Sequence, residues 1–374
     1  MKSAMIICRT ARIGEFAAAY RVCYKRYYTT QENQHTMQKK TIHPYFQIHP
    51  WKSEIEFANS LLKNVIYNAD GIVAINKPYG ISVWNKFQQN VNHPLKQCHH
   101  IVGAVDYSVE NVLPYLAKEL DVPNLIPFSG SEKYMSGVYI FGINTNVCQD
   151  IKKAVRRVEG GKYRKFWAIT TRIPNEIEGK YHLAICLKQN FSLKDKKVII
   201  LPQWSKNLVK KNIIKIFNVD YRVISNSTNN LSSLIEMEAS TKVWHSLRLF
   251  ASIMLYSPIL GDDYHGSRVQ EVMGTWVRID PFAESCWDMP KINRQLLELL
   301  NVRQNQQEII PVHIHLRNVR LISFGEKRKD IVLEAPLIHP FDWTCKQLKF
   351  KNVPYEENNE ENKEKMVMKD LIYN

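Results

Sequence analysis

Short apolar runs rich in β-branched residues, the first of them closed by turn residues, restrict the fold of this chain most strongly. These runs occupy residues 71–75, 137–143, 166–171, 312–316 and 331–335. The first is closed by Asn76-Lys77-Pro78-Tyr79-Gly80, which has the composition of a turn. Runs of this length and composition predict strands. The last two runs are expected to pair with each other.

Helical spacing of apolar residues is confined to a few separate segments. These segments are residues 53–68, 109–120, 147–158 and 241–255. Ser53 is placed to cap the first of them. Many strands with few helices, and without regular strand–helix alternation, predict an α+β fold.

The first thirty residues differ in composition from the rest of the chain. Against the single acid Glu15 they carry Lys2, Arg9, Arg12, Arg21, Lys25 and Arg26. An arginine-rich, acid-poor and roughly amphipathic segment is typical of a mitochondrial transit peptide, and the alternative is a disordered basic leader. We therefore expect residues 1–30 to direct the protein to the mitochondrial matrix.

Composition also suggests the other boundaries. Residues 31–52 are polar and aperiodic and are interpreted as a linker, and residues 53–350 as the folded domain. Residues 85–104 are interpreted as a loop or an insertion within it. Residues 351–374 are polar and largely acidic and are expected to be a disordered tail.

The net charge of +15 and the isoelectric point near 9.3 indicate a polyanionic partner, either nucleic acid or an acidic membrane surface. A basic isoelectric point is also common among mitochondrial matrix proteins. No apolar run reaches about 18 residues, so a transmembrane helix is not expected. The seven cysteines are scattered without a Cys-x-x-Cys pair, which predicts reduced thiols and no zinc ribbon.

Five separated segments, in order, resemble motifs of RluA-type RNA pseudouridine synthases. Residues 76–80 resemble the family's NKPxG segment, and Ser136-Gly137-Val138 resembles the end of its RLDKxTSGV motif. They are followed by matches to TGRxHQIRVH at 241–250, to PIxGD at 257–262 and to a shortened LHA strand at 312–315. Each match alone is weak, but together they cover about residues 70–340.

The resemblance implies a pseudouridine synthase catalytic-domain fold with a long mixed, mainly antiparallel sheet and flanking helices. It also implies RNA as the partner and a reaction without metal or cofactor. In that reaction uracil is detached from its ribose, rotated and rejoined through carbon. An aspartate acts as nucleophile or base, an arginine pairs with it, and an aromatic ring stacks on the uridine after it leaves its helix.

Several of these positions are changed in this sequence. Counted back from Ser136, the family aspartate corresponds to Glu132, and the arginine before it to Gly130. The stacking tyrosine corresponds to Phe166. The first arginine of the later motif corresponds to Val243. The resemblance then predicts a pocket containing Lys77, Lys133, Lys242, His245 and Arg248.

The change to Glu132 makes catalysis doubtful. The additional methylene moves the carboxylate oxygens by about 1 Å, and a misplacement of that size can reduce a rate by about a hundredfold. Lys133 or Lys242 could replace the missing charge, but neither provides a guanidinium fork. Glu132 is therefore either a substituted catalytic acid or a surface loop glutamate in a pocket that has lost its chemistry.

Two basic runs predict contacts with RNA phosphates. They contain Lys152, Lys153, Arg156, Arg157, Lys162, Arg164 and Lys165 in the first, and Lys196, Lys197, Lys210 and Lys211 in the second. Phe191, Trp204 and Phe217 are interleaved with the second run and could stack on bases. Each run could instead be an ordinary solvated face.

Two groups of metal-ligand residue types are not interpreted as metal sites. Cys98-His99-His100 lacks partners at ligand spacing. His313 and His315 match the family's strand and are expected to be structural.

Three functions remain open. The first is a mitochondrial RNA-binding protein with weak or absent isomerase activity, possible partners being ribosome assembly factors. The second is an active synthase that uses Glu132. The third is a basic matrix protein that uses the fold to bind another protein.

Overall fold

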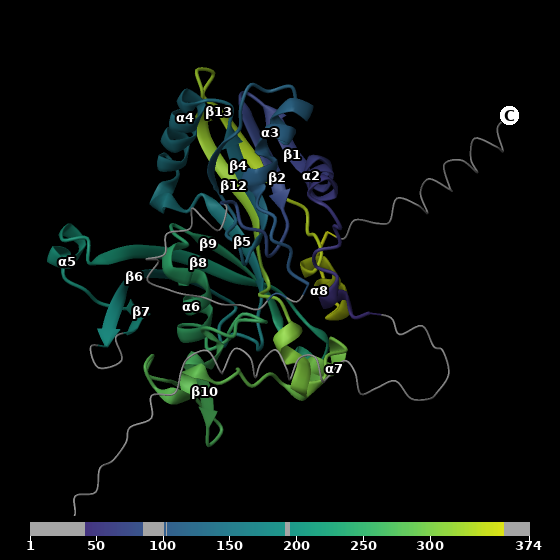
Figure 1. Cartoon of the computed structure of the whole chain (residues 1–374). Coiled ribbons are helices and arrows are strands. Elements are labelled where there is room, and N and C mark those ends of the chain that lie inside the picture. The colour runs from purple at the N-terminus through teal and green to yellow at the C-terminus, as the bar shows by residue number, and fades with distance from the viewer. Residues whose placement is uncertain (1–41, 85–100, 102, 191–194, 355–374) are drawn as a thin grey trace, which may run out of the picture. The chain divides into compact units, whose positions relative to one another are not determined.

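The computed structural model describes residues 42–84, 101, 103–190 and 195–354 (Figure 1). Outside these ranges lie the predicted transit peptide, half of the predicted linker, most of the loop or insertion expected at 85–104 with Cys98-His99-His100, Phe191 and most of the predicted tail. The main compact unit begins at His43. Residues 43–52, interpreted as linker, therefore belong to that unit.

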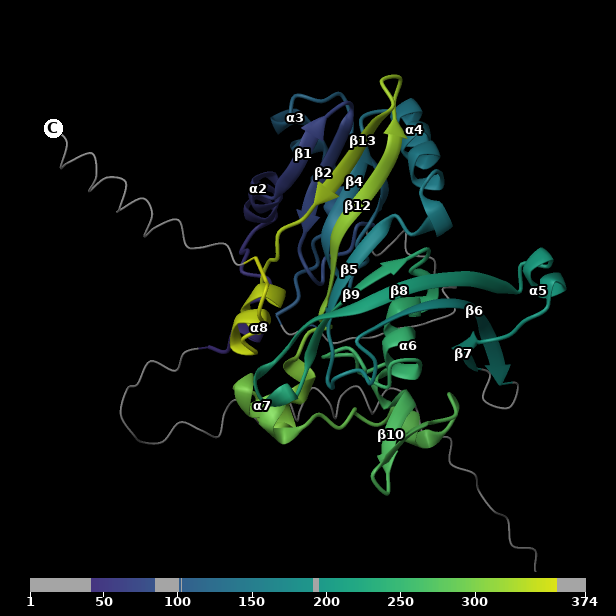
Figure 2. The same cartoon turned by 180° about the vertical axis from the view of Figure 1, so that it is seen from behind.

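Eleven strands form one sheet in the order β1-β2-β4-β12-β5-β9-β8-β6-β7, with β13 added to β12 and β3 to β4 (Figures 1 and 2). The strands are β1 (Val65–Ala69), β2 (Ile72–Lys77), β3 (Ile126–Gly130), β4 (Ser136–Gly142), β5 (Arg164–Ile169), β6 (Glu178–Asn190), β7 (Asp195–Leu201), β8 (Ile214–Asn226), β9 (Ser233–Ala239), β12 (Ile314–Phe324) and β13 (Lys329–Glu334). Among the described strands only β4 and β12 pair in parallel. The predicted α+β fold with a long, mainly antiparallel sheet is confirmed.

The strands expected from the sequence correspond to β2, β4, β5, β12 and β13, and the predicted pairing of the last two is confirmed. A second, two-stranded sheet is formed by β10 (Val269–Val272) and β11 (Thr275–Arg278).

Helices flank the main sheet, with α4 and α5 on one side of the view and α2, α3 and α8 on the other (Figure 1). The α-helices are α2 (Glu54–Lys63), α3 (Val109–Glu119), α4 (Thr145–Arg156), α5 (Lys206–Lys210), α6 (Ser246–Ile253), α7 (Arg294–Leu299) and α8 (Phe341–Gln347). The 3-10 helices are η1 (Pro44–Phe46), η3 (Glu159–Gly161), η4 (Thr228–Asn230), η5 (Val243–His245), η6 (Gly266–Arg268), η7 (Glu284–Trp287) and η8 (Gln304–Ile309).

Two helix predictions were too long. The Ser53 hydroxyl accepts a hydrogen bond from the backbone N–H of Glu56 and caps α2 as expected, but the helix ends at Lys63. From Val65 the chain forms β1, because its apolar residues pair with β2 at a sheet edge. The segment predicted as a helix over 241–255 is α-helical only over Ser246–Ile253, since residues 244 and 245 both have positive φ angles.

Aromatic contacts pack α6 against the sheet. The ring of Phe250 lies 5.2 Å from Tyr181 on β6, and 6.0 Å and 5.9 Å from Phe217 and Tyr221 on β8. Buried aromatic pairs add to the stabilisation from burial of apolar area. Phe217, which the sequence offered as an RNA-stacking ring, is fully buried in this core.

The N-terminal segment 43–52 is anchored by Tyr45. This side chain is fully buried, and its hydroxyl lies 2.8 Å from the hydroxyl of Thr344 on α8. Its ring packs against Trp343 at 5.1 Å. The segment is thus part of a second core, formed with α7 and α8.

The strand β7 forms one edge of the main sheet and pairs only with β6 among the described strands. Its residues Val198–Leu201 are apolar, and Lys196 and Lys197 precede them. The guanidinium of Arg268 donates a hydrogen bond to the backbone oxygen of Val198 at 3.2 Å.

Candidate active site

The loop between β3 and β4 carries Glu132 and is held tightly at both ends. The N–H of Ser131 donates to the oxygen of Val138 at 2.9 Å, and the N–H of Met135 donates to the oxygen of Glu132 at 3.1 Å. The N–H of Gly80 donates to the oxygen of Lys133 at 2.8 Å. The turn after β2 therefore fixes the middle of the loop.

Gly137 permits the approach of β4 and β12 beside this loop. Its φ angle is +108°, and a Cβ atom built there would lie 2.3 Å from the backbone oxygen of Leu316. No other residue type fits such a contact without displacing β12.

Lys77 lies beneath the loop and is fully buried. Its ammonium donates to the backbone oxygens of Pro78 at 2.9 Å, Ile81 at 3.0 Å and Met135 at 2.9 Å. Burial lowers the pKa of Lys77 well below its usual value, and the nearby cations Lys242 and Lys133 lower it further, against the attraction of Glu132. Lys77 therefore joins the β2 turn to the loop that carries Glu132 and does not line an open pocket.

Glu132 and Lys242 form an ion pair across the site. The Lys242 ammonium lies 3.4 Å from Oε1 of Glu132, and the two side chains are 19% and 34% exposed. The same ammonium donates to the backbone oxygen of Gly130 at 2.7 Å. Burial lowers the pKa of Lys242, while Glu132 opposes that shift. Lys242, one of the two predicted substitutes for the missing arginine, thus contacts Glu132.

Arg164 lies closer to this site than its assignment to an RNA-binding run suggested. Its guanidinium donates to the Ser129 hydroxyl at 3.2 Å and stacks on Tyr163. Burial lowers the pKa of Arg164, whereas Tyr163 and Glu132 raise it. The sequence indicates this position only through the place of Arg164 two residues before Phe166 on the same strand.

Phe166 is fully buried on β5. It pairs in register with Leu316 on β12 and with Met237 on β9 and belongs to the same core as Met135, which is 2% exposed. A base can stack on Phe166 only if covering side chains move.

The segment before α6 has an unusual backbone. Trp244 and His245 have φ angles of 55° and 57°, and two successive left-handed residues other than glycine cost of order 1–3 kcal/mol each. The His245 ring lies 5.8 Å from Tyr264 and 5.7 Å from His265. This strained turn brings Lys242 to Glu132 and His245 to the residues after Asp262.

Arg248, predicted as a pocket residue, is buried and bonded to Asp262. The same carboxylate accepts from the backbone N–H groups of Tyr264 at 3.1 Å and His265 at 2.9 Å. Burial alone would raise the pKa of Asp262, but attraction by Arg248 outweighs it and holds that pKa well below its usual value. The pair ties α6 to the turn at 262–265 and is structural.

Asp263 directly follows the segment 257–262 that resembles the PIxGD motif. It lines a cavity of about 190 Å³. Burial and the neighbouring Asp262 raise its pKa to about 7, although Arg248 opposes the shift. In the sequence, this acid is marked only by its place directly after Asp262.

We expect Asp263→Asn to raise the melting temperature at pH 8. The pKa of Asp263 is raised in the folded protein, whereas in the unfolded chain it is near 3.8. Ionisation of this carboxyl at pH 8 therefore costs free energy in the folded state but not in the unfolded state, which lowers the free energy of unfolding. The gain should shrink as the pH falls from 7 towards 4, because the pH then approaches the unfolded-state pKa, below which the carboxyl is protonated in both states. Thermal melts at pH 8, 6 and 4.5 measure it. Glu326→Gln, at an exposed position, is the control, and a gain independent of pH would contradict the assignment.

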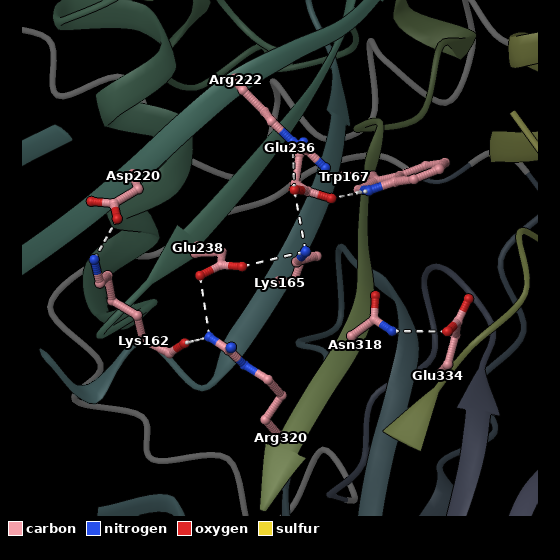
Figure 3. A network of polar contacts seen from close by, with 10 residues as sticks. All are labelled: Lys162, Lys165, Trp167, Asp220, Arg222, Glu236, Glu238, Asn318, Arg320 and Glu334. Atoms are coloured by element: carbon pink, nitrogen blue, oxygen red, sulfur yellow. Dashed lines mark hydrogen bonds and ion pairs between the residues drawn. The ribbon is translucent and has the colours of Figure 1, made fainter. Parts of the chain in front are cut away.

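A polar network covers part of the sheet where β5, β8, β9 and β12 lie together (Figure 3). Glu236 accepts from Trp167 and Arg222 at 3.1 Å and 2.9 Å, and Lys165 lies 3.3 Å from both Glu236 and Glu238. Lys162 is paired with Asp220 (Figure 3). The predicted RNA contacts Lys162 and Lys165 are therefore engaged within the protein.

The remaining cations of the first run lie along the outer face of α4. Lys152, Lys153, Arg156 and Arg157 are all exposed. Ile151, Ala154 and Val155 are buried on the opposite face. Lys153 pairs with Asp150 at 2.9 Å, and Arg157 donates to the backbone oxygen of Ser323 at 2.5 Å.

The second run lies on the projecting part of the sheet that ends in α5 (Figures 1 and 2). Lys210, Lys211 and Lys196 are exposed, and Lys197 lies 5.0 Å from the ring of Tyr264. Trp204 packs against His182 at 5.0 Å. Figures 1 and 2 place this run and α4 on the same side of the view.

His313 and His315 occupy structural positions, as expected. His313 lies 2.7 Å from the Thr344 hydroxyl, and His315 lies 2.8 Å from that of Ser136. Within the described ranges, no three metal-ligand residue types come together as a metal site. In the same part of the chain, no helix combines the length and apolarity needed to cross a bilayer.

No family model matches the chain. It is 26% identical over 294 residues to mouse "Pseudouridylate synthase RPUSD4, mitochondrial", covering 76% of this chain and 68% of the relative. The human protein of that name is 25% identical over 325 residues, covering 82% and 74%. Bovine "Mitochondrial mRNA pseudouridine synthase RPUSD3" is 24% identical over 307 residues, covering 79% and 80%.

A solved structure has the same fold. "Human RNA Pseudouridylate Synthase Domain Containing 4" superposes with a TM-score of 0.56 at 21% identity and covers 80% of this chain and 97% of its own.

Proposed function

Because the chain belongs to the RluA-type RNA pseudouridine synthase family, we propose that it is a mitochondrial RNA-binding protein in which uridine isomerisation is weak or lost. The mitochondrial assignment rests on the names of the relatives and on the composition of residues 1–30. The matrix is the compartment that this composition favours.

The burial of Phe166 and the longer side chain of Glu132 support the proposal that uridine isomerisation is weak or lost. Phe166, at the position of the stacking tyrosine, has no exposed surface. Glu132 holds its carboxylate one methylene further from the backbone than the family's aspartate. Its contact with Lys242 at 3.4 Å is longer than the roughly 2.7–2.9 Å of a strong charge-assisted hydrogen bond.

The outer face of α4 supports retained RNA binding. Four cations lie exposed along two turns of one helix, and cations in such a row neutralise successive phosphates.

One observation favours an active synthase as the second candidate. Lys242 does supply a cation to the carboxylate of Glu132, as the family's arginine does for its aspartate. In that case Glu132 acts as nucleophile or base towards the ribose of the flipped uridine.

Pseudouridine mapping separates the two candidates. Mitochondrial RNA from cells lacking the protein is compared after rescue with wild type, Glu132→Gln or the exposed control Glu159→Gln. We expect no pseudouridine site to depend on Glu132, while RNA levels or ribosome assembly depend on the protein. Sites that vanish and return with wild type and Glu159→Gln, but not with Glu132→Gln, would establish the active synthase.

The same rescue with Glu132→Asp tests whether the longer side chain causes the loss of catalysis. If the longer side chain limits catalysis, the aspartate should create new sites or increase existing ones. An unchanged map would assign the loss to the closed pocket instead.

A further inference from the structure

The segment that joins β7 to β8 exposes aliphatic side chains at the end of a projecting part of the sheet. It comprises residues 202–213, includes α5 and is called the arm tip below. Figures 1 and 2 show α5 at the outer end of β6 and β8. Val209 and Ile213 in the arm tip are 37% and 50% exposed. Single exposed apolar residues are common on proteins, but these two lie four positions apart on one projecting segment.

The arm tip has a defined backbone. At the start of α5 the Ser205 hydroxyl accepts from the N–H of Asn207 at 3.1 Å. After the helix Asn212 has a φ angle of 57°, and the N–H of Ile213 donates to the oxygen of Leu208 at 3.0 Å. A left-handed residue with such a bond is a common way to end a helix. Because β8 pairs with β6 directly after this cap, the exposed side chains belong to a fixed turn.

Lysines surround the exposed aliphatic side chains, and the local sequence contains no acid to balance them. Residues 196–219 include six lysines and neither aspartate nor glutamate. Lys206, Lys210 and Lys211 are exposed. The spacing of Lys206, Val209 and Lys210 on α5 is i, i+3 and i+4, which places them on one face of the helix. The same face therefore presents positive charge and apolar surface.

RNA would match only the charge of this face. Its phosphates would pair with the lysines, but Val209 and Ile213 can neither stack on bases nor hydrogen-bond to them and would stay in water. Residues 196–219 also contain no arginine, whose planar fork suits phosphates of nucleic acids, whereas the outer face of α4 carries two. The arm tip therefore differs in chemistry from the face of α4 that supports RNA binding.

An anionic lipid surface matches both properties. Segments with lysines beside aliphatic and tryptophan side chains bind at the boundary between headgroups and acyl chains, and anionic lipids strengthen that binding. Trp204 in the arm tip is half-buried, with its ring 5.0 Å from that of His182. Tryptophan is enriched at the level of lipid headgroups.

We propose that the arm tip docks the protein on the surface of an anionic membrane. Val209 and Ile213 enter the boundary between headgroups and acyl chains, while the lysines remain among the anionic headgroups. The contact is peripheral and spans nothing. It does not rest on the proposed RNA binding, because that binding was assigned to α4.

Hydrogen–deuterium exchange of the full chain with vesicles tests the proposal. One set of vesicles contains phosphatidylcholine with about 30% phosphatidylserine, and the other contains phosphatidylcholine only. We expect amide exchange in residues 203–213 to slow at least threefold with the anionic vesicles and to stay unchanged with the neutral ones. Because the method locates the contact along the chain, binding by the basic residues 1–30 is not mistaken for binding by the arm tip.

Two variants separate the apolar from the charged contribution. Val209→Ser combined with Ile213→Ser keeps every charge and should remove the protection of the arm tip. Changing Lys206, Lys210 and Lys211 to glutamine should raise the lipid concentration for half-maximal protection at least tenfold, since one lysine near an anionic surface contributes roughly fivefold.

The control changes Lys52, Lys63 and Lys118 to glutamine. These three residues are exposed, and their removal lowers the net charge equally, so the protection of the arm tip should persist. Melting curves establish that each variant is folded.

The possible outcomes distinguish this proposal from the proposed function. An arm tip that anionic vesicles leave unprotected in wild type, or protect equally in the serine variant, overturns the proposal without affecting RNA binding by α4. Equal protection by neutral vesicles also overturns it. Protection by a single-stranded RNA, without any from vesicles, would assign the arm tip to RNA instead.

Discussion

Replacing Arg248 by methionine is expected to destabilise the folded protein by about 3–5 kcal/mol. Both members of the Arg248–Asp262 pair are almost completely buried, so the change leaves the Asp262 carboxylate charged and without its counterion. The two backbone N–H groups that it accepts from cannot replace a full charge. Because domains are stable by only about 5–15 kcal/mol, this loss removes a large part of the total.

Urea unfolding followed by circular dichroism measures this loss. Arg294→Met provides the control, since Arg294 pairs with Glu298 on the surface of α7 with its side chain 83% exposed. Such a pair contributes about 0.3–0.5 kcal/mol. Adding Asp262→Asn to Arg248→Met should restore part of the stability, because it removes the uncompensated charge but keeps an acceptor. No recovery would mean that packing of the arginine, and not its charge, dominates.

Neutralising the outer face of α4 is expected to weaken RNA binding roughly tenfold or more at low salt. The variant changes Lys152, Lys153, Arg156 and Arg157 to glutamine. If all four contact phosphates of single-stranded RNA, the slope of log Kobs against log salt should become shallower by about 3, since each contact contributes about 0.7. The hydrogen bond from Arg157 to Ser323 and the pair of Lys153 with Asp150 are exposed, so little stability should be lost.

The matched control removes the same charge from the other side of the molecule. Lys52, Lys63, Lys118 and Lys349 are exposed. All four lie in α2, α3 or α8 or within two residues of one of these helices, which are away from α4 in Figures 1 and 2. This variant has the same net charge, so a general electrostatic effect would reduce binding equally. Equal loss in both variants would contradict a specific α4 contact. Unchanged binding in the α4 variant would favour the protein-binding alternative.

Local sequence patterns predicted the strands well because the pattern that indicates a strand lies within a few consecutive residues. The run at 71–75 and the turn after it lie within one strand and one turn, and β2 has that form. The helix predicted over 53–68 failed beyond Lys63, where apolar residues fit either a helix or an edge strand and pairing with β2 decided. The burial of Tyr45 depends on Thr344, almost three hundred residues away, so no local pattern could indicate it.

Motif spacing placed Glu132 and Lys242 in one site, and the structure brings them together. It could not distinguish residues that line a pocket from those beneath it. Lys77 and Arg248 are buried because of contacts with Met135 and Asp262, which only the folded chain brings near. The cross-strand pairs that engage Lys162 and Lys165 were invisible for the same reason, since they depend on the register of β5 with β9 and β8.

Lys196 and Lys197 on the edge strand β7 also protect the protein against self-association. A sheet edge with apolar residues can add a strand from another molecule, and charged edge residues together with capped carbonyls prevent this. Lys196 and Lys197 precede the apolar residues 198–201, and Arg268 occupies the oxygen of Val198. Removing the two lysines to probe RNA contacts would also unmask a self-association surface. Loss of RNA binding in that variant must therefore be compared with its state of aggregation.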